Sequence, residues 1–234
     1  MAGSNSPIAA VWLCTDHQKC TDPASRPFTP PVRRHAGGMP HRLPIVLSHH
    51  DLPEAELHAA HRDGELFRVG DCFASIDEIE RPIHRLLATH DGVPAGLIVD
   101  RLSAAWVWGA LKRAPSPRQF CVPIGARLSL SPARRLAVRE VVIDLPEDTV
   151  DLGGHLITTP TRTAVDLARE SVRFEGGDRD ILISLVRIGH IRLDACVAQL
   201  RDRNKMPNKR RAMARLESLA GSLQGQPELT RYTS

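Results

Sequence analysis

A strand that runs directly into a capped helix is the feature that most constrains the fold of this chain. The segment is HLITTPTRTAVDLAR, residues 155–169. Residues 156–158 predict a short strand, and Thr159 suits the N-cap because its hydroxyl can accept a hydrogen bond from the first helical turn. Pro160 follows at the first helical position, where its missing N–H has no cost. A strand that leads straight into a capped helix is typical of an α/β fold.

The helix of this segment carries charge beside an apolar face. Its apolar side chains are Ala164, Val165, Leu167 and Ala168. Arg162 and Asp166 are four residues apart, so their side chains can meet on the helix surface. We interpret this pair as structural, an exposed or half-buried ion pair that contributes at most about 1 kcal/mol if it is exposed.

Three segments resemble those of a known family. ITTPTRTAVDLAR, residues 157–169, resembles the family segment T(S/T)P.RT..DLAR, and LSAAWVWGAL, residues 102–111, is similar to the family segment SAAWLWGL. Residues 52–75 are similar to the N-terminal winged-helix region of the same family. These segments resemble actinobacterial proteins similar to the AbiEi-type antitoxins of type IV toxin–antitoxin systems, and they occur in the order that the family has.

The resemblance implies a DNA-binding regulator that represses its own operon and counters a nucleotidyltransferase-like toxin encoded beside it. The implied partners are operator DNA and that toxin. Few basic residues are available for phosphate contacts, so we expect modest DNA affinity, which homodimerisation would raise. The alternatives are a protein-interaction module without DNA binding, an orphan homologue without a toxin, and a degenerate restriction-endonuclease-like protein.

The fold class expected from these features is α/β (α+β), with an N-terminal winged helix-turn-helix, a small α/β domain and a helical C-terminal tail. The chain of 234 residues, 42% of them hydrophobic, is long enough for this organisation. We predict a disordered extension at 1–38, the winged helix at 39–92, the α/β domain at 93–172, a helical region at 173–222 and a flexible tail at 223–234.

The predicted winged helix consists of a helix over 51–64, with Asp51 as its cap, and a hairpin over 65–75 around a turn at 70–71. In the functional interpretation, the helix lies in the major groove with the hairpin beside it. The side chains expected near DNA are His58, His61, Arg62 and Arg68. In the structural interpretation, they form a solvated helix face and a structural hairpin.

The middle of the chain predicts a further helix starting at Ser75, a helix over 102–111 and strands over 97–99, 120–124, 136–143 and 150–152. Trp106 and Trp108 point to different sides of their helix because they are two residues apart. We expect one in the core and the other in a cleft between elements; stacking of either on a ligand is the alternative.

The C-terminal region predicts a helix over 178–188, a second one capped by Asp194, and a third one that carries the strongest basic cluster of the chain. This cluster consists of Lys205, Lys209, Arg210, Arg211 and Arg215. It is interpreted either as a solvated helix face or as a second surface that contacts phosphates.

The sequence offers no pattern typical of an enzyme or of a resident cofactor. It contains no glycine-rich phosphate loop, H-E-x-x-H or G-x-S-x-G motif. Cys14, His17, Cys20 and His35 lack the paired spacing of a zinc site. A carboxylate metal site at Asp144, Glu147 and Asp148 is an alternative without a nearby lysine. We therefore predict neither an enzyme nor a metal or cofactor site.

The cysteine content and the hydropathy of the sequence indicate the cellular compartment. Five cysteines at irregular spacing argue against a disulfide framework and for a reducing compartment. The sequence has no apolar run near the roughly 18 residues that a membrane span needs. We expect a cytoplasmic protein without membrane contact.

Overall fold

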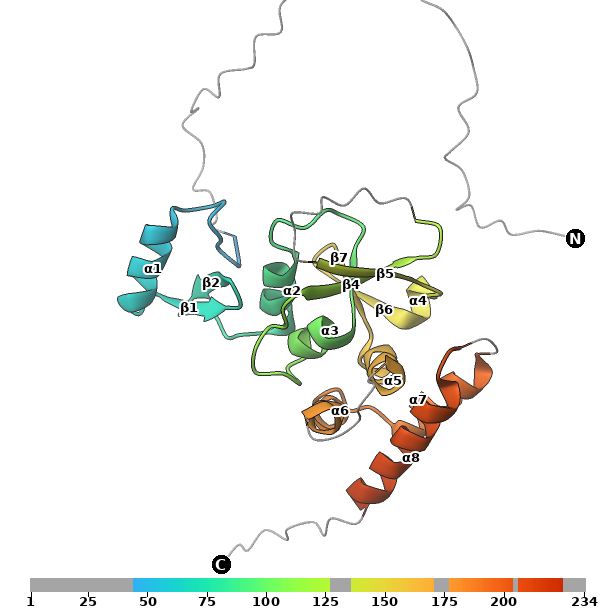
Figure 1. Ribbon diagram of the computed structural model, residues 1–234. Helices are drawn as coiled ribbons and strands as arrows, with labels where there is room; N and C mark the ends of the chain where they lie inside the picture. The colour runs from blue at the N-terminus through green and yellow to red at the C-terminus, as the bar shows by residue number, and fades with distance from the viewer. Residues whose placement is uncertain (1–43, 127–135, 171–176, 204–205, 225–234) are drawn as a thin grey trace, which may run out of the picture. The chain divides into compact units, whose positions relative to one another are not determined.

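The computed structural model describes residues 44–126, 136–170, 177–203 and 206–224. The predictions for 1–38, for the basic loop 127–135, for Lys205 and for the end of the tail fall outside these described residues. The described part is a mixed α+β structure with two sheets (Figure 1), which confirms the coarse fold class.

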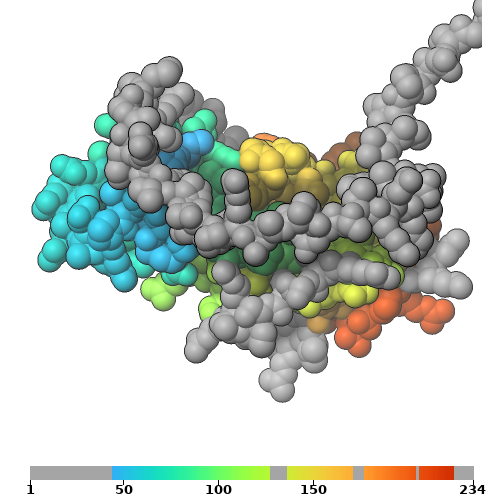
Figure 2. All heavy atoms as spheres, turned by 90° about the horizontal axis from the view of Figure 1, so that it is seen from above, coloured from blue at the N-terminus to red at the C-terminus, as the bar shows by residue number. Residues whose placement is uncertain are grey.

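The predicted helix and hairpin near the start are confirmed as α1 (Glu54–Arg62), β1 (Leu66–Val69) and β2 (Cys72–Ser75). Gly64, with φ +79°, follows the helix in the left-handed region that favours glycine. The predicted cap is wrong. Asp51 accepts a hydrogen bond from the Ser48 N–H at 2.8 Å, and the helix starts after Pro53 without a side-chain cap. The space-filling view of Figure 2 shows the blue and cyan atoms of this part gathered in one surface region.

The winged helix-turn-helix itself stays a prediction. Within the described residues, a single helix precedes the hairpin, and a bridge between Leu47 and Phe73 adds a third short extended segment beside it. The next helix, α2 (Pro82–His90), begins later than the predicted Ser75. Pro82 occupies its first turn, and a residue that precedes a proline is disfavoured in the helical conformation. The helix therefore starts at Pro82, and Ile79 is left 81% exposed.

A five-stranded mixed sheet forms the centre, in the order β5-β4-β3-β7-β6. The strands are β3 (Ile98–Val99), β4 (Arg118–Pro123), β5 (Leu136–Val141), β6 (Thr149–Leu152) and β7 (His155–Thr158). β3 runs parallel to β7, and β4 runs parallel to β5, whereas the other two pairs are antiparallel. β5 is therefore an edge strand with one neighbour in the sheet.

Three helices connect or follow these strands: α3 (Arg101–Val107) lies between β3 and β4, α4 (Leu145–Asp148) lies between β5 and β6, and α5 (Pro160–Glu170) follows β7. The cap predicted for α5 is confirmed, because Thr159 Oγ1 accepts a hydrogen bond from the Arg162 N–H at 3.2 Å. α4 is a single helical turn within the acidic segment considered above as a carboxylate metal site, and Pro146 in its first turn is compatible with a helix start. The β1–β2 hairpin, α2, α3 and the five-stranded sheet share one apolar core, which contains Val69, Leu86 and Phe120.

The C-terminal helices are α6 (Gly177–Ile188), α7 (Leu193–Asp202) and α8 (Lys209–Gln224). They pack on α5 around a second apolar core, which contains Val165, Leu185 and Leu216 (Figure 1). The predicted helical tail is thus a packed layer. α7 begins at Leu193, one residue before the predicted cap. None of the described helices is long and apolar enough to cross a membrane.

Candidate functional site

A cluster of arginine and carboxylate side chains lies between the sheet and the helices α4, α5 and α7. We call it the arginine–carboxylate cluster. Its members come from five segments of the chain and are joined by ion pairs. They are Asp100, Arg101, Arg139, Asp148, Arg162, Asp166, Arg169, Glu170 and Arg203. Charged side chains in a protein interior need partners of opposite charge. The pairing within the cluster therefore decides which of its groups can still bind a ligand.

Arg162 is the most buried cation of the cluster, with a side chain only 2% exposed. Its Nε donates to Asp166 at 2.9 Å, its Nη1 donates to Asp148 at 2.5 Å, and its Nη2 donates to the carbonyl oxygen of Val142 at 3.1 Å. The expected exposed or half-buried pair is therefore fully buried. Helical spacing predicted the contact with Asp166 correctly, but the other two partners come from elements that only the fold brings to α5.

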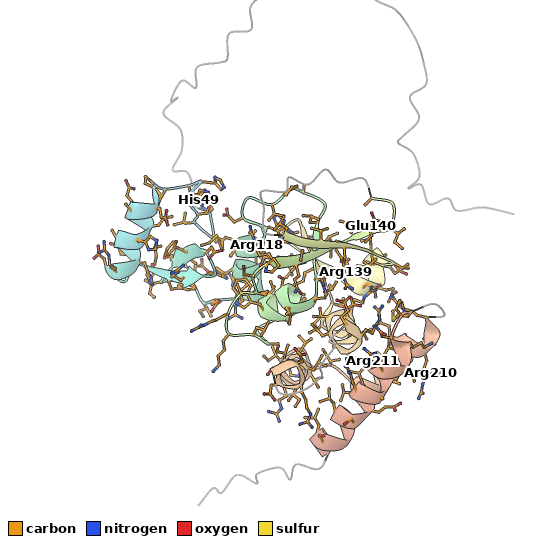
Figure 3. The ribbon with its side chains drawn as sticks, in the orientation of Figure 1. His49, Arg118, Arg139, Glu140, Arg210 and Arg211 are labelled. Carbon is orange, nitrogen blue, oxygen red and sulfur yellow. The ribbon has the colours of Figure 1, made fainter. Side chains whose placement is uncertain are left out.

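Asp166 holds three guanidinium groups together. Besides Arg162, it accepts from Arg139 Nη2 at 3.1 Å and from Arg169 Nη1 at 2.8 Å, and its own side chain is 1% exposed. Arg139 comes from the edge strand β5 (Figure 3), so this carboxylate connects the edge of the sheet to α5.

Asp148 of α4 also binds several cations, as Asp166 does. It accepts from Arg162, from Arg203 at 2.6 Å and from the Gln199 amide at 3.0 Å. Burial alone raises the pKa of the Asp148 carboxyl, but the hydrogen bonds from Arg203 and from the Asp144 N–H, with the charge of Arg162, outweigh it and hold the pKa below its usual range. A carboxylate so fully engaged with cations is unsuited to the metal site considered for residues 144–148.

Asp100 closes the cluster beneath β4. It accepts from Arg139 Nε at 2.6 Å and from Arg101 Nε at 3.2 Å. Arg101 has φ +49°, an uncommon backbone conformation for a residue with a side chain. Arg101 and Arg139 both also pair with Glu170 of α5. The strained Arg101 backbone thus directs a guanidinium group into the cluster.

The cluster contains five guanidinium groups and four carboxylates, so cations are in excess. Arg169 is one of these five guanidinium groups. Burial, together with the charges of Arg139 and Arg162, holds the pKa of its guanidinium below the usual range in spite of Asp166. The arrangement favours the approach of an anion.

A groove of about 1020 Å³ opens beside the cluster. We call it the arginine groove. Four arginines and the two exposed carboxylates Glu140 and Asp144 line it, and so do apolar residues of the β5–α4 segment and of the α7–α8 connection. The lining arginines are Arg139, Arg162, Arg169 and Arg203.

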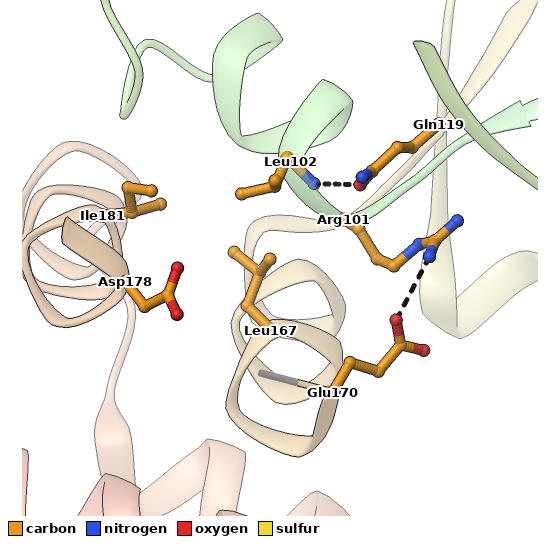
Figure 4. Close-up of a pocket in the computed structure, with 7 residues that line it drawn as sticks. All are labelled: Arg101, Leu102, Gln119, Leu167, Glu170, Asp178 and Ile181. Atoms are coloured by element: carbon orange, nitrogen blue, oxygen red, sulfur yellow. Dashed lines mark hydrogen bonds and ion pairs between the residues drawn. The ribbon is translucent and has the colours of Figure 1, made fainter. Parts of the chain in front are cut away.

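A smaller cavity of about 180 Å³ lies on the other side of Arg101 (Figure 4). Arg101 pairs there with Glu170, and the Leu102 N–H donates to the Gln119 side chain at 2.9 Å. Leu167 and Ile181 form its apolar wall. The Arg101–Glu170 pair and the hydrogen bond of Gln119 therefore occupy polar groups of this cavity.

The residues predicted to contact DNA are brought together around one aromatic ring. His58, His61 and Arg68 all lie against Phe73 of β2, with ring-centre distances of 5.4 and 5.8 Å for the histidines and 5.8 Å from the arginine carbon to the ring centre. His61 also contacts the Leu66 carbonyl oxygen at 2.8 Å. Arg62 is exposed and bonds through Nε to the carbonyl oxygen of His58. Arg62 and Arg68 are therefore the exposed cations of this surface.

The two tryptophans lie on different sides of α3. Trp106 is 4% exposed and packs into the first core, where its ring meets Gly70 of the hairpin turn. Trp108 touches both apolar cores, and its indole N–H donates to the Thr158 carbonyl oxygen at 2.9 Å. Both rings have structural contacts in this arrangement.

The basic cluster of the C-terminus is divided in the structure. Lys209 donates to the carbonyl oxygens of Arg201 and Arg203 at the end of α7. Arg215 donates to the Ala168 carbonyl oxygen at 2.9 Å. Arg210 and Arg211 are exposed near the start of α8 (Figure 3). Among the described residues of this cluster, Arg210 and Arg211 are the ones that are exposed.

One group within the described residues has the ligand types of a metal site. His49, His50 and Asp91 place one ligand atom each within 4.8 Å of one another, with both histidines exposed. His49 is labelled in Figure 3. The Asp91 carbonyl oxygen accepts from Arg118 at 3.0 Å, so a competing cation lies nearby.

Sequence reasoning missed Asp100, Arg139 and Arg203 as members of the arginine–carboxylate cluster. One signal was present, because Arg139 interrupts the otherwise largely apolar strand LAVREV at 136–141. A charged residue inside a half-buried strand needs a partner of opposite charge. The identity of that partner depends on the order of the strands.

Comparison with known proteins supplies a family. A comparison with curated proteins found no match. The chain is similar, at 20% sequence identity, to the RV2827C protein from Mycobacterium tuberculosis, whose crystal structure matches over 82% of this chain and 78% of that chain with a TM-score of 0.40. Residues 87–219 match the model of the AbiEi antitoxin C-terminal domain, and the chain therefore belongs to this antitoxin family.

Proposed function

We propose that this protein is the antitoxin of a toxin–antitoxin pair, that it represses its own operon by binding operator DNA, and that it counters a nucleotidyltransferase-like toxin encoded beside it. The observation that carries the antitoxin role is the family match over residues 87–219. The match begins within α2 and ends within α8, so it includes the sheet, α5 and the arginine–carboxylate cluster.

DNA binding is assigned to the part of the chain that precedes the matched region. In this proposal, α1 and the β1–β2 hairpin form the surface that meets DNA, with Arg62 and Arg68 as phosphate contacts and with His58 and His61 beside them. Support comes from the exposure of both arginines and from the arrangement around Phe73, which holds helix and hairpin together. Two arginines make few phosphate contacts, so the affinity is modest and falls with salt.

Arg210 and Arg211 form a secondary DNA surface in this proposal. Both are exposed on the first turn of α8. Lys209 holds the end of α7 through its two backbone contacts, so it contributes less to a ligand. Neutralising Arg210 and Arg211 is therefore expected to weaken DNA binding less than changes at Arg62 and Arg68.

The test is binding of the purified full chain to its own promoter and to a scrambled duplex at two salt concentrations. We expect a preference for the promoter and a steep loss of affinity with salt. Arg62→Glu together with Arg68→Glu is expected to abolish promoter binding. Arg192→Glu, a charge reversal at an arginine whose side chain is 79% exposed on another element, serves as the control. If the double variant and the control bind the promoter equally well, the assignment of the DNA-binding surface to α1 and the hairpin is wrong.

A protein-interaction module without DNA binding is the second candidate, favoured by a formal net charge of only +4. The neighbouring genes separate the candidates. A nucleotidyltransferase-like gene beside this one supports the antitoxin role, whereas its absence together with no promoter binding supports an orphan interaction protein.

A further inference from the structure

We propose that the arginine groove binds a small organic anion through a phosphoryl group held by Arg169 and Arg203. This inference concerns the α5–α7 side of the molecule and goes beyond the proposed antitoxin function. It rests on the charge balance of the cluster, on the donors that remain in the groove, and on the apolar lining beside them.

The charge balance comes first. Asp148 and Asp166 are almost completely buried, and Arg162 between them is 2% exposed. The five guanidinium groups of the cluster exceed its four carboxylates by one positive charge. Two further carboxylates of the groove, Glu140 and Asp144, are exposed, so solvent screens their charge more than that of the buried cluster. An uncompensated charge in a partly buried site is unfavourable, and an anion that enters from the groove would balance it.

The remaining donors locate the anion. Arg162 and Arg139 use all of their guanidinium nitrogens within the cluster. Among the contacts of the described residues, Arg169 uses Nε and Nη1. Arg203 uses Nη2 alone. Arg169 Nη2 and Arg203 Nε and Nη1 are thus the nitrogens that can still donate.

These two arginines are held in place before a ligand arrives. Arg169 is anchored by Asp166 and by the Pro207 carbonyl oxygen, and Arg203 is anchored by Asp148. A guanidinium group whose orientation is already set loses less entropy on binding an anion. Guanidinium groups match phosphate oxygens geometrically, and a phosphoryl dianion offers enough oxygens for both.

The lining of the groove indicates a small organic molecule. Val142 is 73% exposed and Ile124 is 64% exposed, and Met206 and Pro207 add further apolar surface. A volume of about 1020 Å³ with an apolar lining and a few charged groups is typical of sites for small organic ligands. The exposed carboxylates Glu140 and Asp144 also line the groove. They repel a long polyanion that would cross the whole groove more than a single phosphoryl group held at Arg169 and Arg203. A single phosphoryl group therefore fits better than a nucleic-acid backbone.

The experiment measures saturable binding of inorganic phosphate, AMP and glucose 6-phosphate to the full chain by isothermal titration calorimetry. Adenosine and glucose are the probes without a phosphoryl group. We expect the phosphorylated probes to bind and to compete with phosphate, and the others not to bind. Absence of saturable binding by all three phosphorylated probes would overturn the proposal.

Matched variants locate the site. Arg169→Gln and Arg203→Gln are expected to weaken phosphate binding about tenfold or more, because each loses charge-assisted hydrogen bonds. Arg192→Gln, a change at an arginine whose side chain is 79% exposed outside the groove, is expected to bind like the wild type. Equal weakening by all three variants would show nonspecific attraction and overturn the site.

A second pair of variants leaves the cluster untouched. Val142→Glu adds a carboxylate at an exposed position of the groove, whereas Ile79→Glu makes a similar change at a position that is 81% exposed elsewhere. Weaker phosphate binding by the first variant alone supports the proposal. If Val142→Glu instead weakens binding of a 20-base-pair DNA duplex while phosphate binding is unchanged, the groove contacts nucleic acid and the proposal is wrong.

Discussion

Arg162 and Asp148 form an ion pair of 2.5 Å between two side chains that are 2% and 0% exposed, and they are 14 residues apart in the sequence. The pair joins the single turn α4 to the long helix α5. Because Arg162 simultaneously bonds to Asp166 and to the Val142 carbonyl oxygen, a single guanidinium group connects three segments around the edge of the sheet.

Removing this guanidinium group is expected to destabilise the protein strongly. Arg162→Met keeps much of the apolar length but leaves buried carboxylates with fewer partners, which costs about 3–5 kcal/mol in the free energy of unfolding. Denaturant unfolding followed by circular dichroism measures the change. Arg210→Met, at an exposed position, is the control and is expected to change stability by less than about 0.5 kcal/mol. A similar small change for Arg162→Met would contradict the structural role of the cluster.

We expect the Asp148 carboxylate to make the stability of the folded protein sensitive to acid. Its pKa lies below its usual range in the folded state, whereas the unfolded chain has an ordinary value of about 3.9. The stabilisation is therefore fully present above that value and is lost as the pH falls through the lower, folded pKa. In Asp148→Asn, stability near neutral pH should be reduced, and its decline between about pH 4 and 2 should be shallower. Unfolding midpoints measured across this range test the prediction; parallel curves for the two proteins would contradict it.

The hairpin turn is expected to depend on a glycine for two reasons. Gly70 has φ +62°, and a Cβ built there lies 3.2 Å from a carbon of the Trp106 ring. Gly64 has φ +79° but meets nothing within 4 Å. Gly64→Ala should therefore show only the left-handed backbone cost of about 1–2 kcal/mol.

Gly70→Ala should destabilise the protein further than this control, because the Trp106 ring must also move. Thermal unfolding of the two variants measures the difference. Equal losses would mean that the contact between hairpin and α3 adjusts freely.

The described cysteines are expected to be unreactive in the folded protein. Burial raises the pKa of Cys72 and of Cys196 to about 12, and it also raises the pKa of Cys121 well above the usual range. Because the thiolate is the reactive form, a thiol reagent at pH 8 should modify them only after unfolding. The measurement uses a Cys14→Ser/Cys20→Ser variant, so that these three are the only thiols present. Rapid labelling of any of these cysteines in the folded protein would contradict the prediction and show that the structure around that cysteine unfolds locally.

Local signals in the sequence predicted several elements well. Thr159 and Pro160 mark the start of α5 through hydrogen bonding and a preset backbone angle, and Gly70 marks the hairpin turn through its tolerance of positive φ. Where competing local signals were present, the prediction was less accurate. Asp51 was a plausible cap, but its carboxylate bonds backwards to Ser48, and the helix starts after Pro53.

The sequence by itself determined where α5 begins and where the β1–β2 hairpin turns, because caps, prolines and glycines act over a few residues. It also determined the contact of Arg162 with Asp166, which follows from helical spacing. Only the tertiary structure decided that this pair is buried and shared with Asp148 and Arg139. These partners lie on α4 and on the edge strand β5, and they reach α5 only through the order of the strands in the sheet. The arginine groove is a consequence of that order, because its arginines are distant in sequence and meet through shared buried carboxylates.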